Sequence, residues 1–402
     1  MRLINLLVSF CLLLLFSACK KEGPKQEITT YPVVGLFSLT GNWSSLGVTS
    51  EAVMELAVED INNYLEERGS SVRFSSTVYD TKLDTNLAKS FFQAAVKDLN
   101  AKFVLGPQSS AEVGSIRNMA NDEKVLVMSQ GSTASSLAFP NDAVFRFCPG
   151  DGPEGAAISR TAFQSGKRMM ITLARNDAGN LGLQSSVNTN FTALGGQVDA
   201  LSPYSSSLTD FTAVAQQLRA KIQQHVATFG SGAVGVYLAS FDECVNLFRQ
   251  ALVDPVLRSV NWYGGDGVVL SAPLLADVDA RQFAATVNFF APNFGLPAQA
   301  HPNLASVEAA VRSRTGLDPD AYALSVYDAM WVLANTAADF PITLTDFSAL
   351  KYRFSEEANR FFGISGPVML NINGDRAIGS FDYWGIVNEA GNYRWKIVGK
   401  SN

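Results

Sequence analysis

The chain has 402 residues, of which 47% are hydrophobic and 17% are charged, so it is long enough to bury a large core and favours two folded domains over one. Its formal net charge of −6 argues against a nucleic-acid partner, because phosphate binding needs clustered Lys and Arg and the sequence has no basic stripe. These values exclude a disordered chain and a protein that binds polyanions.

The amino terminus carries the features of a secretion signal. Arg2 precedes an apolar run over residues 3–16, which is too short for a permanent membrane-spanning helix. The run ends in "LFSAC", and residues 1–19 therefore resemble a bacterial lipoprotein signal peptide. The resemblance implies a lipidated Cys19 in the bacterial cell envelope, with the domain in the periplasm or otherwise outside the cytoplasmic membrane. An ordinary signal peptide with a chance cysteine is the alternative. Residues 20–30, "KKEGPKQEITT", predict a polar, unfolded tether.

Cysteine usage leaves one pair to consider. Cys11 lies in the segment that is expected to be cleaved, and Cys19 is expected to carry lipid. Cys148 and Cys244 are therefore the candidates for a disulfide in an oxidising compartment. We favour two buried free thiols, because nothing at either position suggests a structural cross-link.

From Tyr31 onward, strand-like segments alternate with helix-like segments. "YPVVGLFSL" is a β-branched apolar run, and residues 50–69 then place apolar side chains on one face of a predicted helix. Further strands are predicted at "VRFSSTVYD", "KFVLG", "KVLVMS", "RMMITLA" and "GAVGVYLAS", each followed by a predicted helix. Repeated βαβ units predict an α/β fold with two parallel sheets, each covered by helices on both faces.

Two neighbouring predicted strands end in loops of small hydroxyl residues. "VLGPQSSA" carries Ser109 and Ser110, and "VMSQGSTA" carries Ser132 and Thr133. Ligands of open parallel sheets bind beyond the carboxyl ends of the strands, so these hydroxyls and backbone amides predict a site for an anionic group such as a carboxylate. Gly131 permits close approach of the backbone. Capping of the following helices is the alternative role.

Eight segments, taken in chain order, carry a resemblance to a known family: "VGLFSLTGNWSSLGVTSEAVMELAVEDIN", "VLGPQSSA", "VMSQGSTASSL", "VFRFCPGDGPEG", "FRQA", "YGGDG", "YDAMWVLA" and "SGPVMLNINGDRAIGSFDYW". Together they resemble the type I periplasmic binding proteins, specifically the branched-chain amino-acid (Leu/Ile/Val) binding proteins of ABC transporters. The resemblance covers the chain from Tyr31 to roughly Tyr393. It implies two Rossmann-like lobes that close on a ligand like a hinge.

The same resemblance implies three crossovers between the lobes, near Pro149, Pro292 and Ala377. Each lobe is therefore expected to be discontinuous in sequence. The implied division gives a first lobe of residues 31–149 and 292–376 and a second lobe of residues 150–291 and 377–402.

The resemblance also implies which residues bind the two charged ends of an amino acid. Ser110 falls on the position that binds the ligand carboxylate, and Gly131, Ser132 and Thr133 fall on the loop that holds both carboxylate and ammonium. Asp266 in "YGGDG" falls on the acidic residue that pairs with the ammonium. An aspartate that only shapes the turn before the following glycine is the alternative for Asp266.

The aromatic walls of the pocket depart from the family pattern. Tyr322 falls on a stacking aromatic, and Phe241 or the serine before it falls on another. Two family aromatics are replaced here by Ala178 and Leu46, although Trp43 is a possible substitute for the second. The altered walls predict a larger pocket or a more polar ligand than leucine, isoleucine or valine. Alternatively, Tyr322 is a core residue of an amphipathic helix.

Catalytic motifs do not emerge from the sequence. His225 and His301 are the only histidines, and neither lies near a serine elbow or a cysteine pair. "QSGKR" lacks the first glycine and the final Ser or Thr of a phosphate loop. We therefore expect no enzymatic activity, no metal and no cofactor.

The function that the sequence predicts is that of a lipid-anchored solute-binding receptor. It would capture a small amino-acid-like ligand and present it to an ABC permease, and it would contact the membrane through the lipid anchor only. A ligand-sensing or regulatory lipoprotein of the same fold, not coupled to a permease, is the alternative. A structural scaffold with no ligand is a third possibility.

Overall fold

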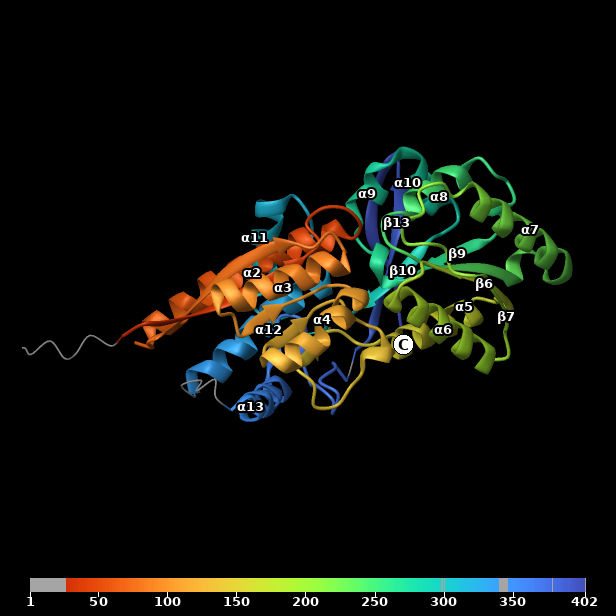
Figure 1. Ribbon diagram of the computed structural model, residues 1–402. Helices are drawn as coiled ribbons and strands as arrows, with labels where there is room; N and C mark the ends of the chain where they lie inside the picture. The colour runs from red at the N-terminus through yellow and green to blue at the C-terminus, as the bar shows by residue number, and fades with distance from the viewer. Residues whose placement is uncertain (1–26, 298, 300, 340–345, 378, 402) are drawn as a thin grey trace, which may run out of the picture.

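The computed structural model describes residues 27–297, 299, 301–339, 346–377 and 379–401 (Figure 1). The predicted signal peptide, Cys19 and the tether up to residue 26 lie outside the described residues. Within the described ranges, no helix combines the length and the apolar character needed to cross a membrane.

A parallel sheet with the strand order β2-β1-β3-β4-β5 forms the centre of the first lobe. Its strands are β1 (Thr29–Phe37), β2 (Val72–Asp80), β3 (Phe103–Leu105), β4 (Leu126–Ser129) and β5 (Val144–Arg146). The helices of this lobe are α2 (Ser44–Glu67), α3 (Thr85–Leu99), α4 (Ser110–Glu123), α11 (Leu304–Thr315), α12 (Ala321–Asp339) and α13 (Phe347–Arg360). A short antiparallel pair, β11 (Phe362–Gly363) and β12 (Gly366–Pro367), follows α13.

Alternating side chains of the central strands fill two separate cores. Phe103 and Leu105 of β3 belong to the hydrophobic cluster that also includes residues of α2 and α12. Val104, which points to the opposite face, belongs to the cluster that includes residues of α3 and α4. Because successive side chains of a strand alternate between faces, continuous apolar runs are suited to a sheet that is covered on both sides. The predicted α/β fold class is confirmed.

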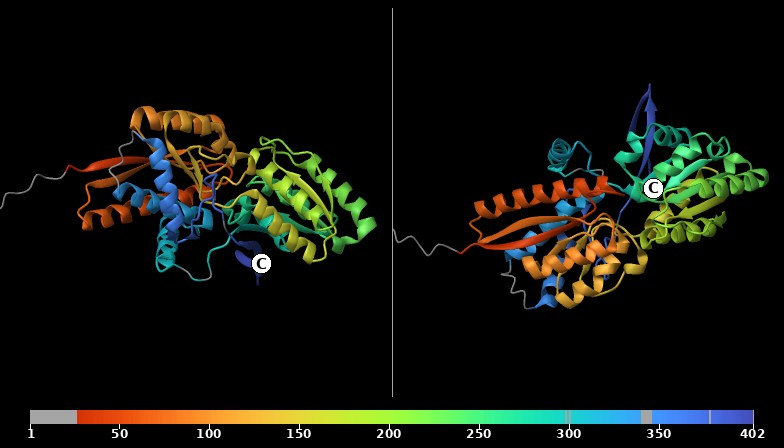
Figure 2. Two further views of the ribbon diagram at one scale, coloured as in Figure 1. Left: turned by 90° about the horizontal axis from the view of Figure 1, so that it is seen from below. Right: turned by 45° about the horizontal axis from the view of Figure 1, so that its top comes forward.

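The second lobe contains the longer sheet, with the order β14-β13-β10-β9-β8-β6-β7. Its strands are β6 (Met169–Ala174), β7 (Gln197–Ala200), β8 (Val234–Ala239), β9 (Asn261–Gly264), β10 (Phe290–Phe294), β13 (Phe381–Glu389) and β14 (Asn392–Lys400). Its helices are α5 (Asp151–Gln164), α6 (Ala178–Ala193), α7 (Thr212–Phe229), α8 (Cys244–Leu252), α9 (Ala272–Ala276) and α10 (Val278–Thr286). β6 to β10 are parallel, whereas β13 and β14 are antiparallel. Figure 2 shows the two lobes side by side in two further views.

Three predicted boundaries differ from the observed elements. β1 begins at Thr29, two residues before the predicted start at Tyr31. Helix α2 begins at Ser44, earlier than the predicted residue 50, because Gly47 lies inside the helix and not in a turn. Glycine is needed at this helical position, since a Cβ there would lie 1.8 Å from the backbone oxygen of Ser38. Residues 292–294, which were expected in the first lobe, belong to β10 and pair with β13 in the second sheet.

The two candidate disulfide residues are free and buried. Cys148 follows β5, and Cys244 begins helix α8 of the second lobe. Burial raises the pKa of both thiols, so each stays protonated and unreactive. The expectation of two free thiols is confirmed.

Candidate functional site

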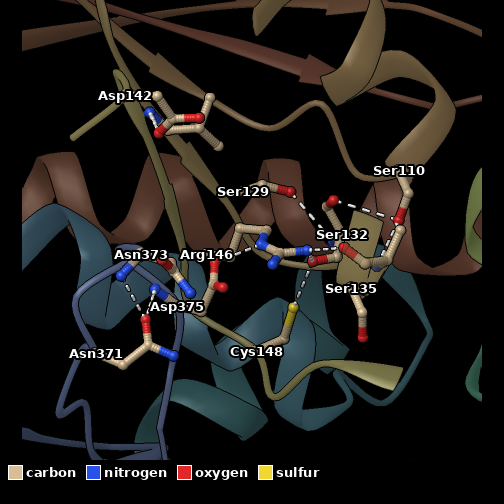
Figure 3. A network of polar contacts seen from close by, with 12 residues as sticks. Ser110, Ser129, Ser132, Ser135, Asp142, Arg146, Cys148, Asn371, Asn373 and Asp375 are labelled. Atoms are coloured by element: carbon tan, nitrogen blue, oxygen red, sulfur yellow. Dashed lines mark hydrogen bonds and ion pairs between the residues drawn. The ribbon is translucent and has the colours of Figure 1, made fainter. Parts of the chain in front are cut away.

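The two hydroxyl loops lie against each other beyond the ends of β3 and β4 (Figure 3). Ser132 Oγ lies 3.3 Å from Ser110 Oγ, which also accepts a hydrogen bond of 3.1 Å from the amide of Ala134. Ser109 caps helix α4, because its hydroxyl accepts from the amide of Glu112 and the Glu112 carboxylate accepts in return. The capping role therefore explains Ser109, while Ser110 and Ser132 form a hydroxyl pair of their own.

A buried arginine fixes the backbone of the second loop. Arg146 Nη1 donates to the carbonyl oxygens of Ala134, at 2.6 Å, and Ser132, at 3.2 Å. Its Nε forms a 2.5 Å ion pair with Asp375, which lies on the chain segment that returns toward the second lobe (Figure 3). Sequence analysis did not single out Arg146, although a charged residue inside the apolar stretch "VFRFC" was a usable signal.

Glycine at position 131 allows the loop to approach its neighbours closely. A Cβ there would lie 2.8 Å from the backbone oxygen of Gln108 and 3.0 Å from Cη2 of Trp43. Leu46 Cδ2 would be 3.3 Å from the same point. The structure thus brings Trp43, Leu46 and Gly131, three of the predicted site residues, into contact on the first-lobe side of the junction.

Trp43 is held by both lobes. Its φ of 58° is uncommon for a bulky residue and costs conformational energy. Gln108 Nε2 donates to the Trp43 carbonyl at 2.9 Å, and the Trp43 amide donates to Asp242 Oδ2 in the second lobe at 2.7 Å. The indole stacks on Phe241 with ring centroids 4.8 Å apart. These contacts offset the strain and place an aromatic pair at the junction of the lobes.

Asp266 and Tyr322 also meet across this junction. Asp266 follows β9 and is buried, and Tyr322 lies in the first turn of α12. The Tyr322 hydroxyl donates to Asp266 Oδ2 at 2.7 Å. The centroid of the Tyr322 ring lies 6.5 Å from that of Trp43, in an edge-on arrangement, and 5.3 Å from that of Phe294. Tyr322 is therefore a fully buried helix residue whose hydroxyl nevertheless faces the carboxyl group of Asp266.

Two further carboxyl groups reach the same region from the first turn of α5. Glu154 Oε1 accepts a 3.2 Å hydrogen bond from the amide of Asp266, and Asp151 Oδ2 accepts a 3.0 Å bond from the amide of Ser135. Burial raises the pKa of Asp151 to about 7, and burial together with the charges of Asp266 and Asp151 raises the pKa of Glu154. Burial also raises the pKa of Asp266. Asp151 and Glu154 stand in "GDGPEG", and sequence analysis missed them.

Ala178, another of the predicted site residues, lies on helix α6. It is the first residue of α6 and is half-buried. A Cβ on its neighbour Gly179 would lie 3.3 Å from Ser110 Oγ, so the start of α6 faces the hydroxyl pair. The start of α6 thus carries two small residues, Ala178 and Gly179, next to this pair.

A metal centre does not explain this arrangement of acids. In the portion of the chain that is described, no group of three or more His, Cys, Asp or Glu side chains is arranged to hold a metal ion. The carboxyl groups lie instead beside aromatic rings, hydroxyls and backbone amides, which is the composition of a site for a small organic molecule.

The chain is similar in sequence to a known protein family and, over most of its length, to an individual protein. A family model described as Periplasmic binding protein matches residues 30–368. An uncharacterized protein of Methanocaldococcus jannaschii is 30% identical over 403 residues, which covers 94% of this chain and 91% of that protein.

Two solved structures illustrate the similarity of fold. One is the branched-chain amino acid transporter substrate binding protein LivJ of Streptococcus pneumoniae in complex with isoleucine, with a TM-score of 0.72, 18% identity, and coverage of 92% of this chain and 99% of that chain. The other is a solute binding protein of R. palustris in complex with benzoate, with a TM-score of 0.71, 15% identity, and coverage of 92% and 96%.

The family match spans most of the chain and confirms the resemblance to type I periplasmic binding proteins. Proteins of this family are solute-binding proteins and not enzymes, and their folded domain works outside the cytoplasmic membrane. The strand order, the residues that meet between the lobes and the family match lead to one conclusion: this chain belongs to the periplasmic binding protein family.

Proposed function

We propose that this protein captures a small amino-acid-like ligand between its two lobes and delivers it to an ABC permease, while a lipid on Cys19 anchors it to the membrane. The observation that carries the proposal is that hydrogen-bond donors and a buried carboxyl group lie on the two sides of the junction between the lobes. Hydroxyls and loop amides around Ser110 and Ser132 suit a carboxylate, and the buried carboxyl group of Asp266 suits an ammonium group.

In this proposal, the first lobe binds the carboxylate end of the ligand. Ser110, Ser132 and Thr133 donate hydroxyl hydrogen bonds, and Gly131 lets the loop amides approach the ligand. The backbone position of this loop is already set by Arg146, so little ordering is lost when the ligand binds.

The second lobe and the aromatic rings complete the pocket in this proposal. Asp266 accepts from the ligand ammonium group, while Trp43, Phe241 and Tyr322 form the walls around the ligand. Leu46 and Ala178 line the sides at which the family pattern has further rings.

The bound molecules of the two similar structures support a carboxylate-binding loop. Isoleucine, in the Streptococcus pneumoniae protein, and benzoate, in the R. palustris protein, share a carboxylate and little else. The acidic second-lobe side of this chain favours a ligand that also carries an amino group.

A thermal-shift screen of the purified protein against amino acids and related carboxylic acids tests the proposal. A ligand that binds only the folded state raises the melting temperature by mass action. We expect amino acids to stabilise the protein and Ser110→Ala to weaken that stabilisation. If no amino acid, carboxylic acid or amine raises the melting temperature, the receptor function is wrong.

A further inference from the structure

Three carboxyl groups are enclosed together at the junction of the lobes. Asp151 and Glu154 are each 1% exposed, and Asp266 is 4% exposed. Asp151 and Glu154 stand three residues apart in the first turn of α5, and Glu154 in turn binds the amide of Asp266. The positive end of the α5 dipole offsets only part of the cost of burying these acids.

Several polar atoms of this group have no partner in the protein. Among the described residues, Asp151 Oδ1 and Glu154 Oε2 are buried and take part in no hydrogen bond. The hydroxyl of Tyr237, a fully buried residue within β8, also has no partner there. Buried polar atoms of native proteins are almost always hydrogen-bonded, so these atoms together point to a bound group that supplies N–H donors.

The Tyr237 hydroxyl belongs to the same cluster. A Cβ on Gly265, the residue before Asp266, would lie 3.3 Å from Tyr237 Oη. Burial, followed by the negative charges of Glu154, Asp266 and Asp151, raises the pKa of Tyr237. The hydroxyl therefore lies beside the loop that carries Asp266, within the influence of the three negative charges. We call Asp151, Glu154, Asp266 and Tyr237 the acidic pocket.

The buried arginines next to the acidic pocket are committed to other partners. Arg146 pairs with Asp375 and donates to two loop carbonyls, although its charge lowers the pKa of Asp151 somewhat. Arg175, which follows β6, pairs with Asp177 and Glu243. These two arginines are therefore committed elsewhere, and protons or a bound cation would neutralise the acidic pocket.

From this geometry we propose that the ligand carries a second cationic group, an ammonium or a guanidinium, that binds in the acidic pocket beside Asp151 and Glu154. The inference rests on the proposed function and narrows its ligand class to basic amino-acid-like molecules. One ammonium supplies a single charge and three N–H donors, which Asp266 and the loop after β4 use in large part. A guanidinium adds five donors in a planar fork, and a second ammonium adds three.

A neutral amino acid would fit this pocket poorly. Its aliphatic side chain would leave Asp151 Oδ1, Glu154 Oε2 and the Tyr237 hydroxyl unpaired in a closed site, and unpaired buried acceptors are costly. The neighbouring rings of Trp43 and Phe241 favour the same ligand class, because aromatic faces attract cations.

Calorimetric titration of the purified full-length protein with a matched series of compounds tests the inference. Norleucine, lysine and arginine share the amino-acid head and differ in side-chain charge, while putrescine and agmatine carry the cationic groups without a carboxylate. We expect lysine or arginine to bind at least about tenfold more tightly than norleucine, since a buried charge pair is worth more than a neutral contact.

Two variants test whether the acidic pocket binds the second cationic group. Glu154→Gln keeps the shape of the side chain and removes its charge, so it is expected to weaken binding of the basic ligand by about tenfold or more and to spare norleucine. Glu112→Gln is the matched control, because Glu112 is also a buried acid with a raised pKa, but it caps α4, where glutamine serves equally well. Asp151→Asn replaces Glu154→Gln if that variant does not fold.

The outcomes separate this inference from the proposed function. Norleucine that binds as tightly as lysine and arginine, with no effect of Glu154→Gln, overturns the second cationic group and leaves the amino-acid receptor intact. Putrescine or agmatine that binds while every amino acid fails supports the acidic pocket and overturns the carboxylate role of Ser110 and Ser132. Failure of all five compounds to bind overturns the second cationic group, whereas the wider thermal-shift screen decides the receptor function separately.

Discussion

At the scale of single residues, the site depends on positions that tolerate little change. Gly131 is the clearest case, because a Cβ there would meet the backbone of Gln108 and the indole of Trp43 at 2.8 Å and 3.0 Å. A backbone atom cannot rotate away as a flexible side chain can. Any side chain at Gly131 must therefore displace either the loop or the strained Trp43.

Gly131→Ala is accordingly expected to reduce both stability and ligand affinity. Overpacking of this kind costs about 1–3 kcal/mol in the free energy of unfolding, which urea titration measures. Gly114→Ala is the control, because Gly114 lies inside α4 and a Cβ there would meet only Leu137 side-chain atoms, the nearest at 3.4 Å. Equal unfolding midpoints for the two variants would show that the loop is not tightly packed.

Asp266→Ala separates a ligand role from a turn role. If Asp266 pairs with an ammonium group in the closed site, its removal weakens binding by roughly 30-fold or more, since truncating one member of a buried pair costs ~2–5 kcal/mol. The ligand-free protein should still fold, because the loss of a buried acid with a raised pKa offsets part of the cost of leaving the Tyr322 hydroxyl unpaired. A lower melting temperature with unchanged affinity would assign Asp266 to the turn alone.

At the scale of elements, the first turn of α5 concentrates charge that folding disfavours. Asp151 and Glu154 are buried there, and their pKa values are raised chiefly by that burial. Parallel strands point their carboxyl ends at this turn, so Ser110, Ser132 and Asp266 approach it from separate loops. In the proposed function, this arrangement lowers stability in order to bind a ligand.

This arrangement predicts the pH dependence of stability without ligand. The pKa of Asp151 is about 7 in the folded protein and near 4 in the unfolded chain, so the folded state binds more protons between these values. The free energy of unfolding must then fall as pH rises from about 4 through 7. We expect a lower melting temperature at pH 8 than at pH 5, and a smaller difference in Asp151→Asn. An unchanged difference in that variant would refute the assignment.

The amino-terminal segment carries its own prediction. Residues 1–19 resemble a lipoprotein signal, so Cys19→Ala should release the protein from membranes without changing the melting temperature. Cell fractionation followed by a high-salt wash measures the distribution. Sedimentation of the Cys19→Ala protein with washed membranes would reveal a different anchor.

The sequence allowed the fold to be predicted further than the site. Apolar runs such as "VVGLF" and "KVLVMS" predicted parallel strands because both of their faces are buried, and the structure agrees. The sequence singled out Ser110, Ser132 and Asp266 because each was expected just beyond the end of a predicted strand and falls on a ligand position of the family; β3, β4 and β9 do end shortly before them.

The remaining parts of the site depend on tertiary packing. Glu154 in "GDGPEG" has the local pattern of an ordinary first-turn acid, and only the packed structure reveals its burial beside Asp266. The role of Arg146 depends on the loop carbonyls that it binds and on its partner Asp375, which is 229 residues away in sequence. The crossover between the lobes was expected near Pro292, but residues 292–294 lie inside β10. Their pairing with β13 joins segments that are distant in sequence, so local sequence patterns do not reveal it.

At the scale of the whole molecule, hydrogen bonds join the two lobes directly. The Trp43 amide binds Asp242, the Tyr322 hydroxyl binds Asp266, and Ser45 Oγ accepts a 2.9 Å hydrogen bond from the amide of the residue that begins α9. Each of these bonds joins the first lobe to the second. A ligand placed between Ser110 and Asp266 would add to the same set of contacts, so ligand binding and closure are expected to be coupled.

Small-angle X-ray scattering of the purified protein, with and without a saturating ligand from the titration series, tests the central claim most directly. The account predicts that the ligand decreases the radius of gyration, because the lobes must approach each other to enclose a small solute. It also predicts a smaller decrease in Asp266→Ala at the same ligand concentration. An unchanged radius of gyration in the wild-type protein, at a concentration at which calorimetry shows full binding, would contradict capture between closing lobes.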